Sequence, residues 1–188
     1  MKKKNKFLKL YKNKKILVTG ATGFKGSWLS FWLNNLGAKV VGVGLKPENG
    51  SILFKSLKLN SLIKQYYLDL SNFKKINNLI KKEKPDIIFH LAAQSIVSES
   101  YLNPLKTIES NTLGSANILE STRINKIKNL VYITSDKCYL NIEKKNGYSE
   151  LDTLGGYDNY SASKAAAEIL FNSYHHSFFK DKILKHAT

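Results

Sequence analysis

The sequence predicts an α/β fold, a doubly wound Rossmann-type parallel sheet. Short apolar runs alternate with segments of helical periodicity throughout residues 14–188. A glycine-rich loop, residues 20–26, directly follows the first apolar run and opens the first helical segment. The 188 residues are 43% hydrophobic, which suits a single domain with a real core. Residues 1–13 form a lysine-rich lead-in that we expect to be mobile.

The predicted strands are short runs of apolar and β-branched residues bounded by turn signals. The run at 87–91 is apolar enough to be covered on both faces, as strands of a parallel sheet are. The chain ends within the sixth run. The predicted strands are residues 16–18, 40–43, 65–68, 87–91, 130–134 and 183–187.

The predicted helices follow from apolar side chains at a 3.6-residue period, whereas residues 46–62 are expected to be mostly irregular. Ser71 is the expected N-cap of the second helix. The helices are predicted at residues 26–36, 71–82, 105–119 and 160–179. The core-facing residues expected in the first helix are Trp28, Leu29, Trp32, Leu33 and Leu36. Those expected in the third are Leu105, Ile108, Thr112, Ala116 and Leu119.

Composition narrows the classes of function. Thirty Lys and Arg residues against 14 Asp and Glu give a charge of +16, with Arg123 the single arginine. This charge favours anionic ligands such as a nucleotide diphosphate, but the arginines that read base edges are missing, so we expect no nucleic-acid partner. One cysteine, Cys138, excludes an intramolecular disulfide, and no metal site is expected. Without a secretory signal or an apolar run of ~18 residues, we expect no membrane partner and a cytoplasmic location.

The glycine loop has the spacing G-x-x-G-x-x-G of a dinucleotide-binding turn. Gly20 permits the tight turn, Gly23 lets the backbone approach a pyrophosphate, and Gly26 allows close packing of helix and sheet. The helix N-terminus adds N–H donors and a partial positive charge. An acidic residue after the second strand is typical of NAD preference, but none precedes Glu48, and Lys46 could accept a 2′-phosphate. The choice between NAD and NADP stays open.

A second set of residues carries the expected chemistry. Tyr160 and Lys164 lie four residues apart, so a helix presents both on one face. A phenol is a poor base at neutral pH, and a nearby ammonium favours its phenolate form. Ser135, Asp136 and Lys137 follow the fifth strand at the sheet edge where ligands bind. Ser135 could bond a substrate oxygen, and Asp136 and Lys137 form a possible acid–base pair or merely a polar turn.

Four segments of the chain resemble the extended short-chain dehydrogenases/reductases and, within them, the CDP-glucose 4,6-dehydratases. The glycine loop and the Tyr–Lys pair mark only the superfamily, whereas T-G-F-K-G-S-W and T-S-D-K-C-Y are far more specific. Ala21, Tyr157 and Asn159 depart mildly from the family pattern. The segments that carry the resemblance are residues 18–29, 90–94, 134–139, and 154–156 together with 160–164.

The resemblance implies a complete set of site residues. The catalytic residues would be Ser135, Asp136, Lys137, Tyr160 and Lys164. The cofactor-binding residues would be Gly20, Thr22, Gly23, Phe24, Lys25, Gly26, Asp69, Leu70, Leu91, Ala92, Ala93 and Asn111, with Tyr160 and Lys164. The substrate would contact Gln94, Ser135 and Tyr139.

The resemblance also implies a reaction, the conversion of CDP-glucose to CDP-4-keto-6-deoxyglucose by transient oxidation of the sugar with NAD. Tyr160 would take the proton of the sugar 4-hydroxyl while NAD accepts the C4 hydride. Lys137 would remove the C5 proton, which requires a strongly lowered pKa, for example by burial near Lys164, and Asp136 would protonate the departing 6-hydroxyl. NADH would then return the hydride to C6. Such enzymes serve the synthesis of lipopolysaccharide O-antigen sugars.

Family members continue far beyond residue 188, so the resemblance implies an N-terminal, NAD-binding half without the C-terminal substrate domain. Related enzymes are often dimers through the helices at 111–120 and 160–179. Three further readings compete with an active dehydratase. They are an inactive truncated NAD-binding module, a nucleotide-sugar epimerase or reductase, and, ranked last, a nucleic-acid binder.

Overall fold

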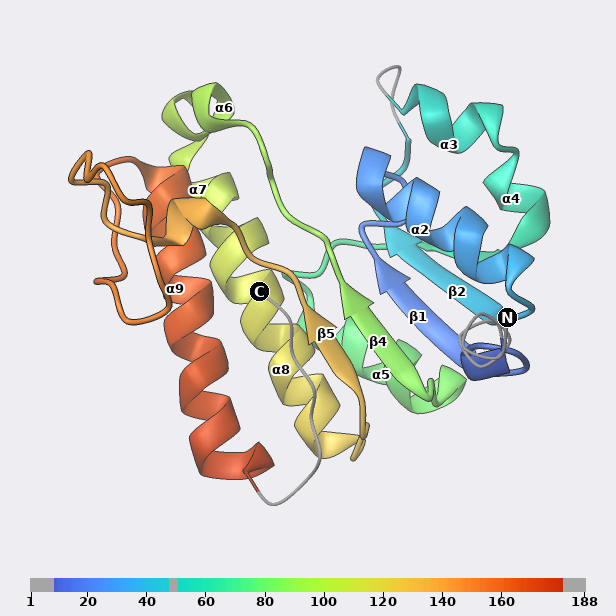
Figure 1. Cartoon of the computed structure of the whole chain (residues 1–188). Coiled ribbons are helices and arrows are strands. Elements are labelled where there is room, and N and C mark those ends of the chain that lie inside the picture. Colours follow the sequence, from blue (N-terminus) through green and yellow to red (C-terminus); the bar gives the residue numbers. More distant parts are fainter. Residues whose placement is uncertain (1–8, 48–50, 181–188) are drawn as a thin grey trace.

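Five parallel strands form a single sheet in the computed structural model, which describes residues 9–47 and 51–180 (Figure 1). The strand order is β3–β2–β1–β4–β5. Because the order reverses between β1 and β4, a crevice opens at the carboxyl ends of these two strands. The predicted doubly wound parallel sheet is confirmed. The strands are β1 (Lys15–Thr19), β2 (Lys39–Gly44), β3 (Lys64–Tyr67), β4 (Ile87–His90) and β5 (Leu130–Tyr132).

Helices cover both faces of this sheet (Figure 1). One face packs on α2 (Phe24–Asn35), α3 (Ile52–Ser56) and α4 (Leu59–Leu62). The other packs on α5 (Phe73–Glu83), α8 (Gly114–Ile124) and α9 (Asn159–Tyr174). The remaining helical segments are α6 (Val97–Leu102), α7 (Pro104–Ile108), the 3₁₀ turn Asp136–Cys138 and the π-helical turns Glu109–Leu113 and His175–Phe179. The predicted sixth strand, 183–187, lies outside the described residues.

Two cores separate on either side of the sheet, because successive side chains of a strand point to opposite faces. In β1, Ile16 and Val18 face the core under α2, whereas Leu17 faces the core under α5 and α8. All three are completely buried. A strand buried on both faces reads as a continuous apolar run, which is why the sequence signal was clear.

The face that α2 buries differs from the predicted one. Trp28 and Trp32 are both 49% exposed, and of the five expected core residues only Leu33 is fully buried. The helix instead lays Gly26, Ser27 and Ser30 on the sheet. The reason is close approach: a Cβ added to Gly26 would lie 2.0 Å from the Gly20 carbonyl oxygen. At that separation the small side chains must face inward, so the bulky ones face outward.

The helix after Pro104 also departs from its predicted stripe. Leu105 is 75% exposed and Ile108 is 42% exposed, whereas Leu119 is buried as expected. Residues 109–113 form a π-helical turn between α7 and α8. The wider turn shifts the register, so a stripe drawn at 3.6 residues per turn does not continue across it.

Two smaller observations concern the helix cap and the lead-in. Asn72, not Ser71, caps α5, because its side-chain oxygen accepts a hydrogen bond from the Lys75 N–H at 3.0 Å. Within the described part of the lead-in, the Tyr11 ring lies 6.5 Å from that of Phe89.

No helix of the described ranges is long and apolar enough to cross a membrane.

Candidate active site

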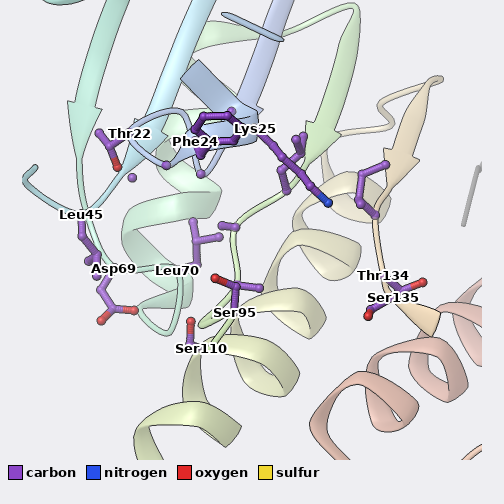
Figure 2. Close-up of a pocket in the computed structure, with 18 of the residues that line it drawn as sticks. Thr22, Phe24, Lys25, Leu45, Asp69, Leu70, Ser95, Ser110, Thr134 and Ser135 are labelled. Atoms are coloured by element: carbon purple, nitrogen blue, oxygen red, sulfur yellow. The ribbon is translucent and has the colours of Figure 1, made fainter. Parts of the chain in front are cut away.

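A cavity of about 440 Å³ opens at the carboxyl edge of the sheet. Figure 2 shows it between the glycine loop, the segments after β2, β3 and β4, and the end of β5. α9 closes the remaining side with Tyr160 and Lys164. The cavity therefore lies where a doubly wound sheet binds its ligands.

Backbone atoms build the wall of the cavity formed by residues 20–26. Gly20 has a φ of +73°, and a Cβ there would lie 2.9 Å from the Ala92 nitrogen. Gly23 donates its N–H to the Gly20 carbonyl at 2.9 Å and precedes α2, whose N-terminus has no side-chain cap. The first-turn N–H groups of α2 thus remain available to an anion. This wall fits the pyrophosphate of a dinucleotide.

Opposite this loop lies an ion pair that the sequence did not indicate. The Lys106 ammonium is 2.6 Å from Asp69 Oδ2, and the Ser71 N–H donates to Asp69 Oδ1 at 2.9 Å. Asp69, Leu70 and Lys106 all line the cavity. Lys46 is exposed and residues 45–47 contain no carboxylate, so the structure leaves the choice between NAD and NADP open.

α9 presents the Tyr–Lys pair to the cavity. Asp158 caps the helix by accepting the Ser161 N–H at 2.8 Å, which fixes the first turn and Tyr160 within it. Tyr160 and Lys164 are each only 8% exposed. Burial, followed by the positive charge of Lys25, lowers the pKa of Lys164 from 10.5 to about 8. Figure 2 shows Lys25 extending from the glycine loop toward the side of Thr134 and Ser135.

Asn111 stands behind the cavity rather than in its lining. It lies on the π-helical turn, where its Oδ1 accepts the Gln94 N–H at 2.7 Å. Its Nδ2 donates to the Gln94 carbonyl at 3.0 Å and to Ser163 Oγ at 2.9 Å. Asn111 thereby fixes the segment after β4 against α9.

A buried polar chain under the crevice supports the same segment. Thr19 Oγ1 accepts the N–H groups of Leu91 and Ala92, both at 3.2 Å, and lies 2.8 Å from His90 Nδ1. His90 Nε2 lies 2.9 Å from Ser115 Oγ. Burial, then the charge of Lys164, lowers the pKa of His90 from 6.5 to about 3. His90 is therefore neutral, and both of its ring nitrogens have hydrogen-bond partners, as expected of a histidine with a structural role.

The turn after β5 holds the expected acid–base pair directly after Ser135. Ser135 lines the cavity and donates to Asp136 Oδ1 at 3.1 Å. The Lys137 ammonium lies 3.5 Å from Asp136 Oδ2, with the lysine side chain 56% exposed and the aspartate side chain 80% exposed. Among the described residues, Lys137 therefore lacks the burial that could make it a base.

Most residues named for the site meet in this cavity. Gln94 and Tyr139 do not line it: the Gln94 amide donates to the Ile96 carbonyl at 2.9 Å, and the Tyr139 ring stacks on Tyr148 at 5.8 Å. Asn111, Asp136 and Lys137 also lie outside the lining. Those that line it are Gly20, Thr22, Gly23, Phe24, Lys25, Gly26, Asp69, Leu70, Leu91, Ala92, Ala93, Ser135, Tyr160 and Lys164.

Several lining residues had no role in the sequence analysis. Ser95 follows the β4 segment, Ser110 precedes Asn111, and Lys106 lies on α7. Their position next to residues already singled out was the available signal. Within residues 9–47 and 51–180, no group of three metal-ligating side chains occurs.

The comparisons with known proteins agree with this geometry. The model of the GDP-mannose 4,6 dehydratase family matches residues 17–182. The chain is 44% identical to CDP-glucose 4,6-dehydratase of Salmonella typhimurium, covering 90% of this chain and 47% of that protein. It is 32% identical to dTDP-D-glucose 4,6-dehydratase of Dictyostelium discoideum, covering 87% and 41%. The chain thus spans about half the length of these relatives.

A solved structure extends the likeness to three dimensions. The UDP-Glc/GlcNAc 4-epimerase of Campylobacter jejuni matches with a TM-score of 0.80 and 25% identity, over 93% of this chain and 52% of that one. Sheet, cavity and sequence agree with the family match, and the chain belongs to the GDP-mannose 4,6 dehydratase family of nucleotide-sugar dehydratases and epimerases.

Proposed function

We propose that this chain carries the cofactor and proton-transfer residues of a lyase, a CDP-glucose 4,6-dehydratase that uses NAD. The observation that supports this most directly is the buried Tyr160–Lys164 pair, which shares one cavity with the glycine loop and Ser135. The likeness to the Salmonella enzyme supports CDP-glucose as the substrate. The product would be CDP-4-keto-6-deoxyglucose.

The roles that we propose for the residues are those that the resemblance implies, and their positions around the cavity support them. Bound NAD supplies a hydride acceptor and afterwards a hydride donor. The Lys164 ammonium stabilises Tyr160, which faces the cavity, in its phenolate form. The phenolate takes the proton of the sugar 4-hydroxyl and becomes a neutral phenol. Ser135 donates a hydrogen bond to the 4-oxygen.

The elimination of water falls to the turn after β5. Lys137 removes the C5 proton, which the 4-keto group acidifies, and Asp136 protonates the departing 6-hydroxyl. Both residues directly follow Ser135, which lines the cavity, and the Lys137 ammonium lies 3.5 Å from Asp136 Oδ2. A lysine must be neutral to act as a base and an aspartate must be protonated to act as an acid, so the Lys137 ammonium must first pass its proton to the Asp136 carboxylate. We propose that the bound substrate or the rest of the protein covers both side chains and thereby favours this neutral pair over the ion pair.

One observation favours a second candidate, a cofactor-binding module without turnover. Lys137 is 56% exposed in a chain half the length of its relatives. The two candidates differ only in the fate of the sugar, because both bind NAD through the same cavity.

The setting of the enzyme is also part of the proposal. We propose a cytoplasmic enzyme that takes a nucleotide sugar as its partner and contributes to O-antigen sugars. Self-association through α8, α9 and the π-helical turns that adjoin them is supported by exposed Leu113, Ile169 and Phe178, which are 46%, 56% and 47% exposed. Apolar surface of this kind on neighbouring helices is typical of an interface between copies.

Calorimetric titration of the 188-residue chain with NAD, followed by CDP-glucose and detection of the 4-keto-6-deoxy product, tests the proposal. We expect Tyr160→Phe to lower turnover at least 100-fold with NAD binding retained, a typical loss for a removed general base. Tyr157→Phe is the matched control, since Tyr157 is 89% exposed.

The second pair of variants is Lys137→Ala with the exposed Lys145→Ala as its control. We expect only Lys137→Ala to stop the elimination. Binding without product supports the cofactor-binding module instead. Turnover unaffected by both Tyr160→Phe and Lys137→Ala would contradict the assigned roles.

A further inference from the structure

Glu168 is a buried carboxylate that the proposed reaction does not use. It lies one turn beyond Lys164 and two turns beyond Tyr160 on α9, so the three share one face of the helix. Glu168 is only 8% exposed. A buried acidic side chain needs partners, because an unpaired one is costly to fold.

The first partner of Glu168 comes from the segment that follows β5. The Thr134 hydroxyl donates a hydrogen bond to Glu168 Oε1. Thr134 lines the cavity and precedes Ser135 at the start of the turn that follows β5. This bond connects two segments 34 residues apart, the helix of the Tyr–Lys pair and the turn of the acid–base pair.

The second partner is the charge of Lys164. The described groups acting on it are Lys25 from α2, His90 from β4, Cys138 from the 3₁₀ turn and Glu168 from α9. Tyr160 lies one turn away on α9 itself. His90 is neutral, and burial raises the pKa of Cys138 to about 11, so its thiol is neutral too.

Glu168 is therefore the negative charge that opposes Lys25 at this lysine. The glutamate and the lysine form no direct ion pair among the described residues, so the charge of Glu168 acts through the buried space between them. Buried charges are screened little by water, so the attraction between Glu168 and Lys164 extends beyond contact distance.

We propose that Glu168 is a positioning residue of this site: through Thr134 it holds the turn of Ser135 against α9, and its charge, one helical turn from Lys164, favours the ammonium form of that lysine. The proposal deepens the proposed function, on which the value of an ammonium beside Tyr160 rests. Two separable roles follow, a tether and a counter-charge, and two variants separate them. Glu168→Gln keeps an oxygen for Thr134 but removes the charge, whereas Thr134→Val removes the tether but keeps the charge.

The counter-charge is tested by competitive acetylation of all lysines in the 188-residue chain between pH 6 and pH 11, read peptide by peptide in a mass spectrometer. We expect Glu168→Gln to lower the midpoint of Lys164 by about one pH unit, which raises the neutral, reactive fraction of Lys164 about fivefold at pH 7. Thr134→Val should leave that midpoint in place. The exposed Glu150→Gln is the matched control and should leave it in place too.

The tether is tested by amide hydrogen exchange in the turn. The Cys138 N–H bonds the Ser135 carbonyl at 3.0 Å, and the Tyr139 N–H bonds the Asp136 carbonyl at 3.3 Å. We expect Thr134→Val to speed the exchange of these two amides about tenfold, which corresponds to the loss of a single hydrogen bond of ordinary strength. Glu168→Gln should leave their exchange close to that of the wild type.

If Glu168→Gln does not fold, Glu168→Asp replaces it, and it should keep the Lys164 midpoint while speeding the two amides. An unchanged midpoint in Glu168→Gln, or unchanged exchange in Thr134→Val, overturns the proposal. None of these readouts needs cofactor, substrate or turnover. A failure of the proposed function would therefore leave them untouched and can be told apart.

Discussion

The two walls of the cavity are built by different means. The glycine wall, residues 20–26, consists of backbone atoms at the start of α2 packed so closely that Gly20 and Gly26 have no room for a Cβ. The α9 wall consists of the buried side chains of Tyr160 and Lys164, with the buried Glu168 one turn further along the helix. The glycine wall has no space for additional atoms, whereas the α9 wall contains a buried charge. We therefore expect the protein to lose stability when a methyl group is added to the glycine wall and to gain stability when the Lys164 ammonium is removed.

The largest expected effect is the addition of one methyl group to the glycine wall. In Gly26→Ala the Cβ would lie 2.0 Å from the Gly20 carbonyl oxygen and 2.6 Å from its carbonyl carbon. Both are backbone atoms of the turn, so α2 must move off the sheet. We expect the free energy of unfolding, measured by urea titration with circular dichroism, to fall by about 4 kcal/mol or more.

Gly155→Ala is the matched control, because its Cβ would meet the Leu140 side chain at an ordinary 3.6 Å. We expect a change within about 0.5 kcal/mol there. If the two variants unfold at the same urea concentration, space does not limit the glycine wall.

The glycine wall could be predicted from the sequence because its requirements are local. The spacing of Gly20, Gly23 and Gly26 after a buried strand sets the turn without help from distant residues. The same closeness misled the prediction for α2. The periodicity of bulky apolar residues predicted that Trp28 and Trp32 face the sheet. The close approach of α2 to the sheet instead requires the small residues Gly26 and Ser30 on that face.

A smaller and opposite effect is expected in the α9 wall. Lys164→Met keeps the length of the side chain and removes its buried charge. Because burial lowers the pKa of Lys164 from 10.5 to about 8, the ammonium costs about 3 kcal/mol in the folded state at pH 7. We expect the variant to be more stable than the wild type by about that amount in urea titrations, and to lose turnover.

The pH dependence of this difference gives a second check. Between pH 8 and pH 10.5 the unfolded wild type binds more protons at Lys164 than the folded one, so the stability of the wild type rises with pH. The advantage of Lys164→Met should therefore shrink over that range. The exposed Lys145→Met is the control and should show no advantage at pH 7. A destabilised Lys164→Met would mean that the ammonium is better paired than the described contacts indicate.

The sequence predicted only part of the α9 wall and of the contacts around it. Tyr160 and Lys164 stand one helical turn apart, so their pairing follows from local geometry. The bond between Thr134 and Glu168 and the ion pair of Lys106 and Asp69 join segments 34 and 37 residues apart, which periodicity cannot relate. Only the packing of α7 and α9 around the strand ends brings these residues together.

The smallest expected effect concerns His90, which lies beneath both walls. Its pKa falls from 6.5 to about 3 on folding, so the unfolded chain takes up a proton below pH 6.5 that the folded chain refuses. Stability must therefore decline with acid, by about 2 kcal/mol between pH 7 and pH 5 from this residue alone. Urea titrations of wild type and His90→Gln at the two pH values measure it, because the glutamine does not titrate.

We expect the wild type to lose about 2 kcal/mol more than His90→Gln over this range. The exposed His176→Gln controls for the loss of a histidine as such and should keep the acid sensitivity of the wild type. The comparison uses the change in the free energy of unfolding with pH, not its absolute value, because His90→Gln also removes the hydrogen bonds to Thr19 and Ser115. Equal slopes would mean that the folded chain accepts the proton, and His90 would then be free to act as an acid beside Lys164 rather than as a support for the segment after β4.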